Sequence, residues 1–251
     1  MSPFVKSFLI AQTFLTRLPT PKISTINEEE ISRSILCYPL IGLCIGFLLV
    51  LLAYFLSTFI NPTAYSILAA IIITFWVLIT GGLHLDGLAD TADGFIGGHA
   101  IAQRTLEIMK DPVSGPIGIA SIVLVLLLKY GAVVSILESK ISYWSLLLAP
   151  MVARGVAIGL LTYSPVAQTQ GLAFELKKVE YPEIVALILF LITVIVYLIT
   201  NLTVIIIISL LVYSIRHWAI LRLEGITGDI LGFNIEVTEA VFLVMTVFVL
   251  G

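Results

Sequence analysis

The sequence predicts an all-α, polytopic membrane protein, a bundle of about seven transmembrane helices. Of its 251 residues, 59% are hydrophobic and only 12% are charged. The mean hydropathy of +1.13 lies far above the range of soluble domains. No hydrophilic stretch is long enough for a separate soluble domain. We therefore expect one integral membrane domain over residues 1–251, with the lipid bilayer as its surroundings and no nucleic-acid partner.

Apolar stretches define the predicted spans, because a transmembrane helix needs about 20 such residues. The stretches of suitable length are residues 37–60, 66–83, 117–137, 143–162, 184–200, 202–218 and 237–250. The second, fifth, sixth and seventh are short, so their ends are the least well defined.

The start of the chain, FLIAQTFLTRLP, is also apolar. Arg17 and Pro19 interrupt it and it lacks a small-residue cleavage site, so we do not expect a removed signal peptide. Two structures fit this segment. It is either an interfacial helix, with Lys6, Thr13 and Arg17 on one stripe, or a short first span.

Positive charge is concentrated on one side of the predicted bundle. The segments on that side, which hold most of the lysines and arginines, are 1–36, 84–116, 163–183 and 219–236. The opposite loops contain only Lys140. By the positive-inside rule, the amino terminus and the segment around Asp86 face the cytoplasm, and the carboxyl terminus lies outside. We expect a multi-pass protein of the cytoplasmic (inner) membrane.

Three aspartates and a histidine lie between two apolar stretches, in HLDGLADTADG at residues 84–94. Asp86, Asp90 and Asp93 stand at i, i+4 and i+7, so in a helix they share one face and can converge on a divalent cation. A carboxylate at the bilayer centre costs roughly 2.5–3.5 kcal/mol on insertion scales, which places the cluster at the membrane edge or in a polar cavity. The alternative is a solvated loop. His84 could bind metal, act as a base or hydrogen-bond a loop carbonyl.

A second charged segment, RTLEIMKDPVSGPIG, follows at residues 104–118. Arg104, Glu107, Lys110 and Asp111 recur there at spacings of three to four residues. Magnesium prefers oxygen ligands and bridges carboxylates to substrate phosphates, while Arg and Lys neutralise the remaining charge. The combination predicts a metal-bound phosphate, with a solvated loop as the alternative, above all for Glu107.

A third polar segment, EGITGDILGFNIEVTE at residues 224–239, precedes the last predicted span. We expect Asp229 to lie in a glycine-punctuated turn, where it is a candidate binding residue. Glu236 and Glu239 stand at the entrance to an apolar helix. There they either bind a ligand or interact with the helix dipole.

Two cations lie inside apolar stretches. Arg154, in APMVARG, is the better candidate for an anion contact because guanidinium binds phosphate bidentately. Lys129 has no visible partner, and we expect a structural role for it. The sequence contains no P-loop, dinucleotide fingerprint or cysteine metal site. Any nucleotide is therefore held without a separate nucleotide-binding domain.

Together these segments resemble one known family, the cobalamin (5′-phosphate) synthases, which are adenosylcobinamide-GDP ribazoletransferases. The likeness covers most of the chain: FLTRLPTP at 14–21, YPLIG at 38–42, GGLHLDGLADTADGFIGG at 81–98, EIMKDPVSGPIG at 107–118, APMVAR at 149–154, and GITGDILG at 225–232 with Glu236 and Glu239. The chain departs from the family pattern at Pro112 after Asp111, and at Phe233 and Asn234, where the family has smaller residues.

The resemblance implies a Mg²⁺-dependent transfer in the last steps of cobalamin biosynthesis. The ribose hydroxyl of α-ribazole, or of its 5′-phosphate, attacks the cobinamide-side phosphorus of adenosylcobinamide-GDP. GMP leaves, and adenosylcobalamin or its 5′-phosphate is formed.

From the resemblance we also assign roles to residues, as a hypothesis. The ligands of one or two Mg²⁺ ions would be Asp86, Asp90 and Asp93, with Asp111 as a fourth. The cations that stabilise the leaving phosphate would be Arg104, Lys110 and Arg154. The hydroxyl proton would be accepted by His84 or a spare aspartate. The further metal or ribazole contacts across the cavity would be Asp229, Glu236 and Glu239.

Other functions fit parts of the pattern. A membrane prenyltransferase or CDP-alcohol phosphotransferase would keep the metal and change the substrate. The sequence lacks the second aspartate-rich motif of the former and the D-G-x-x-A-R run of the latter. A transporter or metal-ion channel would line a pathway with carboxylates, whereas nearly all acidic residues here lie on one side of the predicted bundle. The base of the ribazole, the number of metal ions and the oligomeric state stay open.

Overall fold

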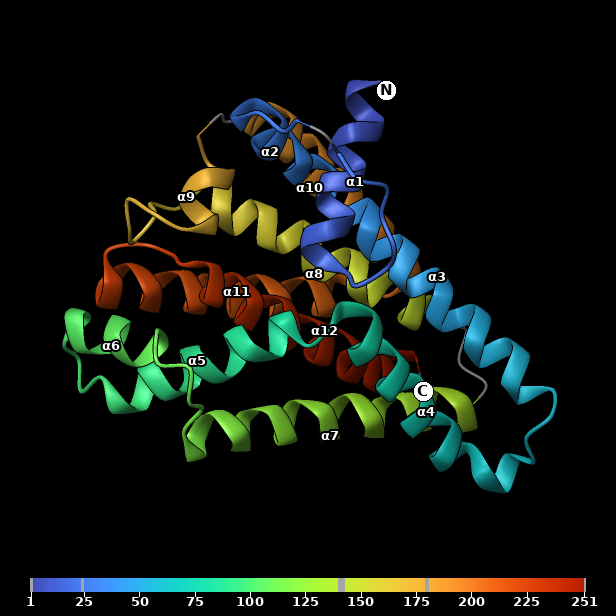
Figure 1. The fold of residues 1–251 in the computed structure, drawn as a ribbon. Helices are drawn as coiled ribbons and strands as arrows, with labels where there is room; N and C mark the ends of the chain where they lie inside the picture. Colours follow the sequence, from blue (N-terminus) through green and yellow to red (C-terminus); the bar gives the residue numbers. More distant parts are fainter. Residues whose placement is uncertain (1, 24, 140–142, 179–180, 251) are drawn as a thin grey trace.

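The structure is a computed structural model that describes residues 2–23, 25–139, 143–178 and 181–250. Within these residues the chain forms α-helices, short 3-10 turns and an isolated bridge (Figure 1). Seven helices in this part of the chain are long and apolar enough to cross a membrane. The predicted all-α, polytopic class and number of spans are confirmed. Lys140, predicted in an outer loop, lies outside the described residues.

The span helices are α3 (Tyr38–Ser57), continuous with α2 (Glu28–Ser34) through η1 (Ile35–Cys37), then α4 (Tyr65–Thr80) after η2 (Pro62–Ala64), α7 (Pro116–Glu138), α8 (Trp144–Thr162), α10 (Pro182–Ile199), α11 (Leu202–Leu223) and α12 (Gly228–Leu250). The shorter helices are α1 (Pro3–Leu15), α5 (Leu83–Gly97), α6 (Ala102–Met109) and α9 (Leu172–Leu176).

Helix α8 lies at the centre of the bundle. The protein buries 89% of its span, against 17% for α10 and 22% for α11. It packs against α3 and α12, whose apolar side chains share its core. Helices α10 and α11 therefore present most of their apolar surface outward, as a lipid-facing helix does.

The last span is longer than predicted. We expected residues 237–250, whereas α12 begins at Gly228 and includes Asp229, Glu236 and Glu239. Asp229 thus lies in the first helical turn and not in a separate turn, and both glutamates lie well inside the helix and not at its entrance. Cations on neighbouring helices pair with the two glutamates, which allows the helix to continue through them.

The amino-terminal helix α1 has 13 residues, fewer than the about 20 that a span needs. Its Lys6 Nζ lies 2.6 Å from a carboxylate oxygen of Glu30 in α2. Arg17 lies beyond the end of the helix. This short helix, tied to α2 by an ion pair, favours the interfacial alternative.

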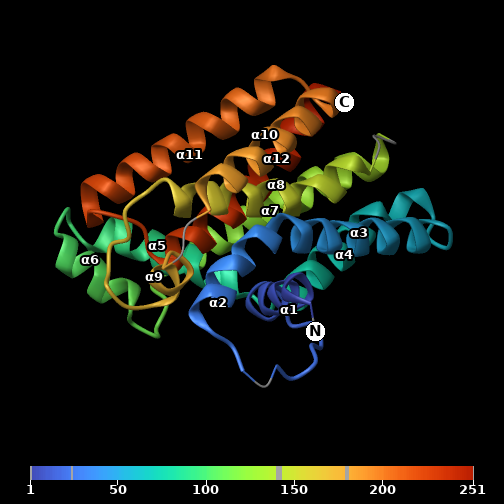
Figure 2. The same ribbon diagram turned by 90° about the horizontal axis from the view of Figure 1, so that it is seen from above.

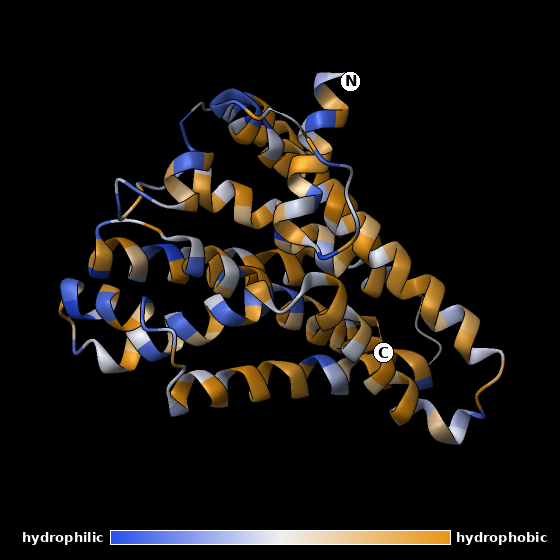
Figure 3. Ribbon diagram, in the orientation of Figure 1, coloured by the Kyte–Doolittle hydropathy of each residue, from blue (hydrophilic) through white to orange (hydrophobic). Residues whose placement is uncertain are grey.

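Helix α5 leaves the α4 span through a tight turn. Gly81 and Gly82 both have positive φ, 68° and 69°, a conformation that glycine adopts at little cost. Helix α5 then packs against α7 and α12. Seen from above, α5, α6 and α9 lie at the same end of the bundle (Figure 2). Hydrophilic residues are frequent on α5 and α6, whereas α3 and α7 are mostly apolar (Figure 3).

Candidate active site

A cavity of about 300 Å³ lies where α5, the α9 region and the start of α12 meet. Asp86 of α5 and Asp229 of α12 both line it. The two helices approach closely because residue 87 is glycine. A Cβ there would lie 2.8 Å from the backbone carbonyl oxygen of Asp229. The sequence thus brings two carboxylates, far apart in the chain, to one cavity.

Asp90 lies one helical turn beyond Asp86 and completes an acidic cluster. The pKa of Asp90 is raised to about 7, first because burial disfavours its charged form and then because Asp86, Asp229 and Asp93 repel its charge. Within the described ranges, no lysine or arginine forms an ion pair with Asp86, Asp90 or Asp229. A bound cation would relieve this repulsion.

Asp93 differs from its neighbours because the protein already uses both of its carboxylate oxygens. Oδ2 accepts a hydrogen bond from the backbone N–H of Gly115 at 2.6 Å, and Oδ1 accepts one from Gly118 at 2.9 Å. These donors stand at the start of α7, where the helix dipole favours a negative charge. Asp93 therefore ties α5 to α7.

The acidic cluster is suited to a metal ion that takes some of its ligands from the protein and the others from a substrate. Among the residues that the structure describes, no three His, Cys, Asp or Glu side chains are arranged to hold a metal ion by themselves. Mg²⁺ at phosphate sites commonly takes one or two carboxylates and completes its shell with phosphate oxygens and water. The carboxylates of Asp86, Asp90 and Asp229 fit such an ion in their donor chemistry.

Asp90 and Asp93 are not among the residues that line the cavity, and neither are the other charged candidates on and after α6. Asp111 is exposed, and its Oδ1 accepts a hydrogen bond from the backbone N–H of Val113 at 2.9 Å. Arg104 is exposed and stands 3.6 Å from Glu107 within α6. Lys110, just after α6, is close enough to act electrostatically on Asp229. Of these candidates, Lys110 is thus within electrostatic range of the acidic cluster.

Arg154, Glu236 and Glu239 form an ion network inside the bundle and do not line the cavity. Arg154 of α8 and Glu239 of α12, both fully buried, form an ion pair. Lys129 of α7 pairs with Glu239 and stands 2.6 Å from Glu236. Its Nζ also lies 4.6 Å from the ring centre of Trp76. The structural role expected for Lys129 thus has partners that the sequence did not reveal.

His84 connects this network with the cavity. It lines the cavity, and its Nδ1 lies 3.5 Å from Nη2 of Arg154. The pKa of His84 lies well below its usual range, because burial disfavours the imidazolium and because Arg154 and Lys129 repel it. The imidazole is therefore neutral at neutral pH.

The loop of residues 163–171 lines part of the cavity and is hydrogen-bonded to the segment before α12. The backbone N–H of Ala167 donates to the carbonyl of Ile226 at 3.0 Å, and the N–H of Ile226 donates to the carbonyl of Pro165 at 2.9 Å. At the start of α12, the hydroxyl of Thr227 accepts a hydrogen bond from the backbone N–H of Ile230. These contacts hold the loop beside Asp229.

Uncharged polar residues that we had assigned no role also line the cavity: Tyr38, Gln168, Gln170 and Thr227. Tyr38 and Thr227 fall in segments that carry the family resemblance, which is a signal that could have found them. Gln168 and Gln170 have no such signal, because two polar residues in a loop have no distinctive spacing.

The fold and this cavity define a polytopic, all-helical membrane protein with an acidic site at one end of its bundle. A family model described as cobalamin-5-phosphate synthase matches residues 7–247. The chain belongs to this family and is a transferase of cobalamin biosynthesis, as the resemblance predicted.

Several relatives are similar over nearly their whole length. The chain is 39% identical over 244 residues to the adenosylcobinamide-GDP ribazoletransferase of Pseudomonas fluorescens. The aligned region covers 94% of this chain and 96% of the relative. The chain is 36% identical over 254 residues to the protein of that name from Alkalilimnicola ehrlichii, with 95% and 94% covered. No solved structure matches this one.

Proposed function

We propose that this protein joins α-ribazole, or α-ribazole 5′-phosphate, to adenosylcobinamide-GDP. The products are adenosylcobalamin, or its 5′-phosphate, and GMP. The observation that carries the proposal is the similarity, over nearly the whole chain, to relatives named adenosylcobinamide-GDP ribazoletransferase. The acidic cavity supports it, because the substrate contains a diphosphate.

The transfer exchanges one phosphorus–oxygen bond for another. The ribose hydroxyl oxygen bonds to the cobinamide-side phosphorus, the phosphoanhydride bond to the GMP phosphate breaks, and a base accepts the hydroxyl proton. Such a reaction requires mainly positioning and charge neutralisation. The clustered carboxylates, a nearby lysine and a cavity between three elements are suited to that task.

The assignment of roles follows the contacts of each side chain. Asp86, Asp90 and Asp229 would hold Mg²⁺, which supplies charge neutralisation at the diphosphate when it is bound. Asp93 fixes α5 against α7 through its two backbone hydrogen bonds. Lys110 stabilises the leaving phosphate.

His84 acts as a hydrogen-bond donor in this proposal. A guanidinium can only donate, so Nδ1 of His84 accepts from Arg154 and the imidazole proton is assigned to Nε2. The imidazole then offers its Nε2–H to a phosphate oxygen. Mg²⁺ commonly takes one or two carboxylates, so the aspartate of the cluster that it leaves unbound accepts the hydroxyl proton. This is the spare aspartate, one of the two alternatives from the sequence.

We also propose that the cavity faces the cytoplasm and that the protein lies in the cytoplasmic membrane. The support is the concentration of lysines and arginines in the segments around the cavity. A cysteine-accessibility experiment with a Gln103→Cys variant tests it, because an impermeant thiol reagent added to intact cells should leave this α6 residue unlabelled. Labelling from outside would show that this residue faces the exterior and that the topology is the opposite of the proposed one.

Reconstitution tests the reaction itself. Purified protein in detergent is given adenosylcobinamide-GDP, α-ribazole and Mg²⁺, and GMP and the completed corrinoid are measured by chromatography. We expect both products in equal amounts, and none after chelation with EDTA. A parallel reaction with α-ribazole 5′-phosphate identifies the preferred acceptor. Failure with both acceptors, together with turnover of a prenyl diphosphate, would contradict the proposal.

A further inference from the structure

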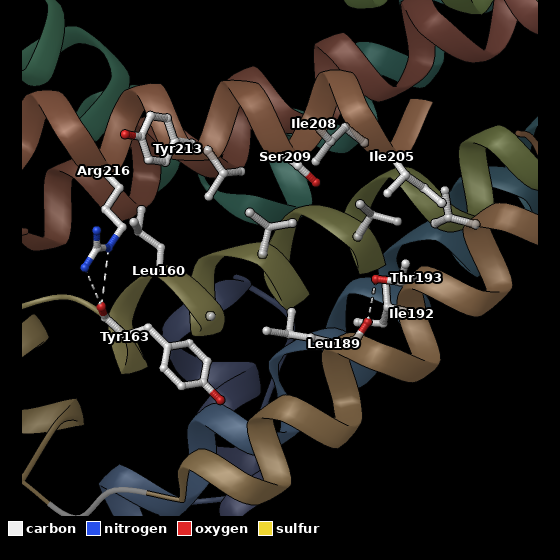
Figure 4. Close-up of a pocket in the computed structure, with 15 residues that line it drawn as sticks. Leu160, Tyr163, Leu189, Ile192, Thr193, Ile205, Ile208, Ser209, Tyr213 and Arg216 are labelled. Atoms are coloured by element: carbon white, nitrogen blue, oxygen red, sulfur yellow. Dashed lines mark hydrogen bonds between the residues drawn. The ribbon is translucent and has the colours of Figure 1, made fainter. Parts of the chain in front are cut away.

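A second cavity, of about 390 Å³, lies between α8, α10 and α11 and shares no lining residue with the candidate active site. Aliphatic side chains such as Val152, Leu189 and Ile205 line most of it. Figure 4 shows side chains of the three helices facing this space, with Arg216 and Tyr163 at one end. Because the rest of the protein leaves most of α10 and α11 exposed, we call this space the lipid-side groove.

Arg216 is the charged residue among those lining the groove. Its Nη2 donates to the backbone carbonyl of Tyr163 at 3.0 Å, and its Nε donates to the hydroxyl of Ser164 at 3.1 Å. Both acceptors are neutral. In the described part of the chain, Arg216 forms no ion pair with an Asp or Glu. The guanidinium therefore keeps an uncompensated positive charge at the end of an apolar groove.

The dimensions of the groove match one leaflet of a bilayer. Along α11 it extends from Ile205 to Arg216, which is about 16 Å at 1.5 Å per residue. Half of a hydrocarbon core of about 30 Å is about 15 Å. Tyr163 and Tyr213 stand at the same end as Arg216, as amphipathic aromatic residues do at membrane interfaces. A cation at the interface and an apolar channel one leaflet deep are complementary to one kind of molecule.

We propose that the lipid-side groove binds an anionic phospholipid. One acyl chain lies among the aliphatic side chains, and the headgroup phosphate contacts the guanidinium of Arg216. An apolar helix from a second copy of the chain would fill the groove equally well, but it would leave the charge of Arg216 without a counter-ion. The charge therefore selects the phospholipid.

The lipid-side groove lies next to the start of a loop that reaches the candidate active site. Arg216 holds Tyr163 and Ser164, which begin the loop that carries Gln168 and Gln170 to the candidate active site. The lipid phosphate would thus lie beside the anchor of this loop. The binding proposal itself does not depend on the proposed reaction.

Native mass spectrometry of the detergent-purified full chain tests the proposal. Phosphatidylglycerol and phosphatidylcholine with identical palmitoyl-oleoyl chains are titrated separately, and a dissociation constant is obtained for each. Because one lysine or arginine near a membrane surface contributes about fivefold in affinity for anionic lipid, we expect phosphatidylglycerol to bind about fivefold more tightly. Arg216→Gln should remove this preference, and Arg216→Lys should retain it.

A steric variant tests the groove independently of charge. Ser209 faces the groove on α11, so Ser209→Phe should weaken the binding of both lipids severalfold. Leu210→Phe is the matched control, because the neighbouring Leu210 is 60% exposed and is not part of the groove lining. Arg33→Gln, which removes an arginine outside the groove, controls for net charge.

Several results would overturn the proposal. Equal affinities of the wild type for the two lipids would contradict the role of Arg216, as would an unchanged preference in Arg216→Gln. A lipid-free dimer that Ser209→Phe dissociates would show that a second copy occupies the groove. Monodisperse gel filtration of each variant ensures that these results refer to folded protein.

Discussion

Helix α12 contributes carboxylates to two sets of acidic residues, and the two sets differ in their partners. At the start of the helix, Asp229 faces Asp86 and Asp90 of α5, and acid lies beside acid. About 10 Å further along the helix, Glu236 and Glu239 each meet a buried cation. The second set is paired within the protein, whereas the first set forms no ion pair within the described residues and is the metal site of our proposal. The partner of an acid, and not its place in a segment that resembles the family, decides whether it is available to a ligand.

The largest expected effect comes from removing a carboxylate of the second set, which is paired with buried cations. Glu239→Gln leaves Arg154 and Lys129 with less negative charge in a buried environment, and removing one partner of a buried pair costs about 3–5 kcal/mol. We expect the free energy of unfolding, measured by SDS titration in mixed micelles, to fall by this amount. Glu29→Gln, in an exposed pair with Arg33, should change it by less than about 1 kcal/mol. Equal stability of the two variants would show that the buried network is not structural.

Removing a carboxylate of the first set should affect activity and not stability. Asp90→Asn removes a proposed ligand of the cation at the diphosphate, and loss of one such electrostatic contact costs roughly 100-fold in rate. The free energy of unfolding should not fall, because the substitution relieves repulsion from Asp86, Asp229 and Asp93. The transferase assay and the unfolding titration measure the two quantities, with the exposed Glu107→Gln as control. Normal turnover by folded Asp90→Asn would refute the assignment.

Asp93 shares a helix face with Asp86 and Asp90, and its substitution tests whether one of these three aspartates has a structural role. Asp93→Asn loses the charge that accepts hydrogen bonds from Gly115 and Gly118, so the unfolding free energy should fall by about 1.5 kcal/mol. The loss of activity should be smaller than in Asp90→Asn. A variant with full stability but 100-fold lower turnover would restore the metal-ligand role that the sequence suggested.

The smallest effect is expected at a third kind of polar residue on α12. Asn234 is fully buried, and among the described residues neither its amide nitrogen nor its amide oxygen has a hydrogen-bond partner. Asn234→Leu removes an unsatisfied group while keeping a similar volume, which should raise the unfolding free energy by roughly 1 kcal/mol. The same SDS titration measures it. A loss of stability would mean that the amide is satisfied in the membrane-embedded protein.

Local patterns in the sequence predicted the local features of this structure. The seven spans follow from runs of apolar residues, and the helical register of Asp86, Asp90 and Asp93 follows from their spacing, since α5 contains all three. Contacts across helices have no such signature. Lys129 is separated from Glu236 by 107 residues, so its partner could not be predicted, and neither could the start of α12. The occupied oxygens of Asp93 depend on where the backbone of α7 begins, which spacing alone does not reveal.

Direct measurement of cation binding tests whether Asp86, Asp90 and Asp229 together hold a divalent ion. Mn²⁺, which also prefers oxygen ligands, is titrated into the detergent-purified protein in the presence of GDP, and free Mn²⁺ is followed by electron paramagnetic resonance. We expect saturable binding in the wild type and in Glu107→Gln, and affinity at least about tenfold weaker in Asp90→Asn and in Asp229→Asn. Mn²⁺ binding by both aspartate variants with wild-type affinity would contradict the acidic cluster as the metal site.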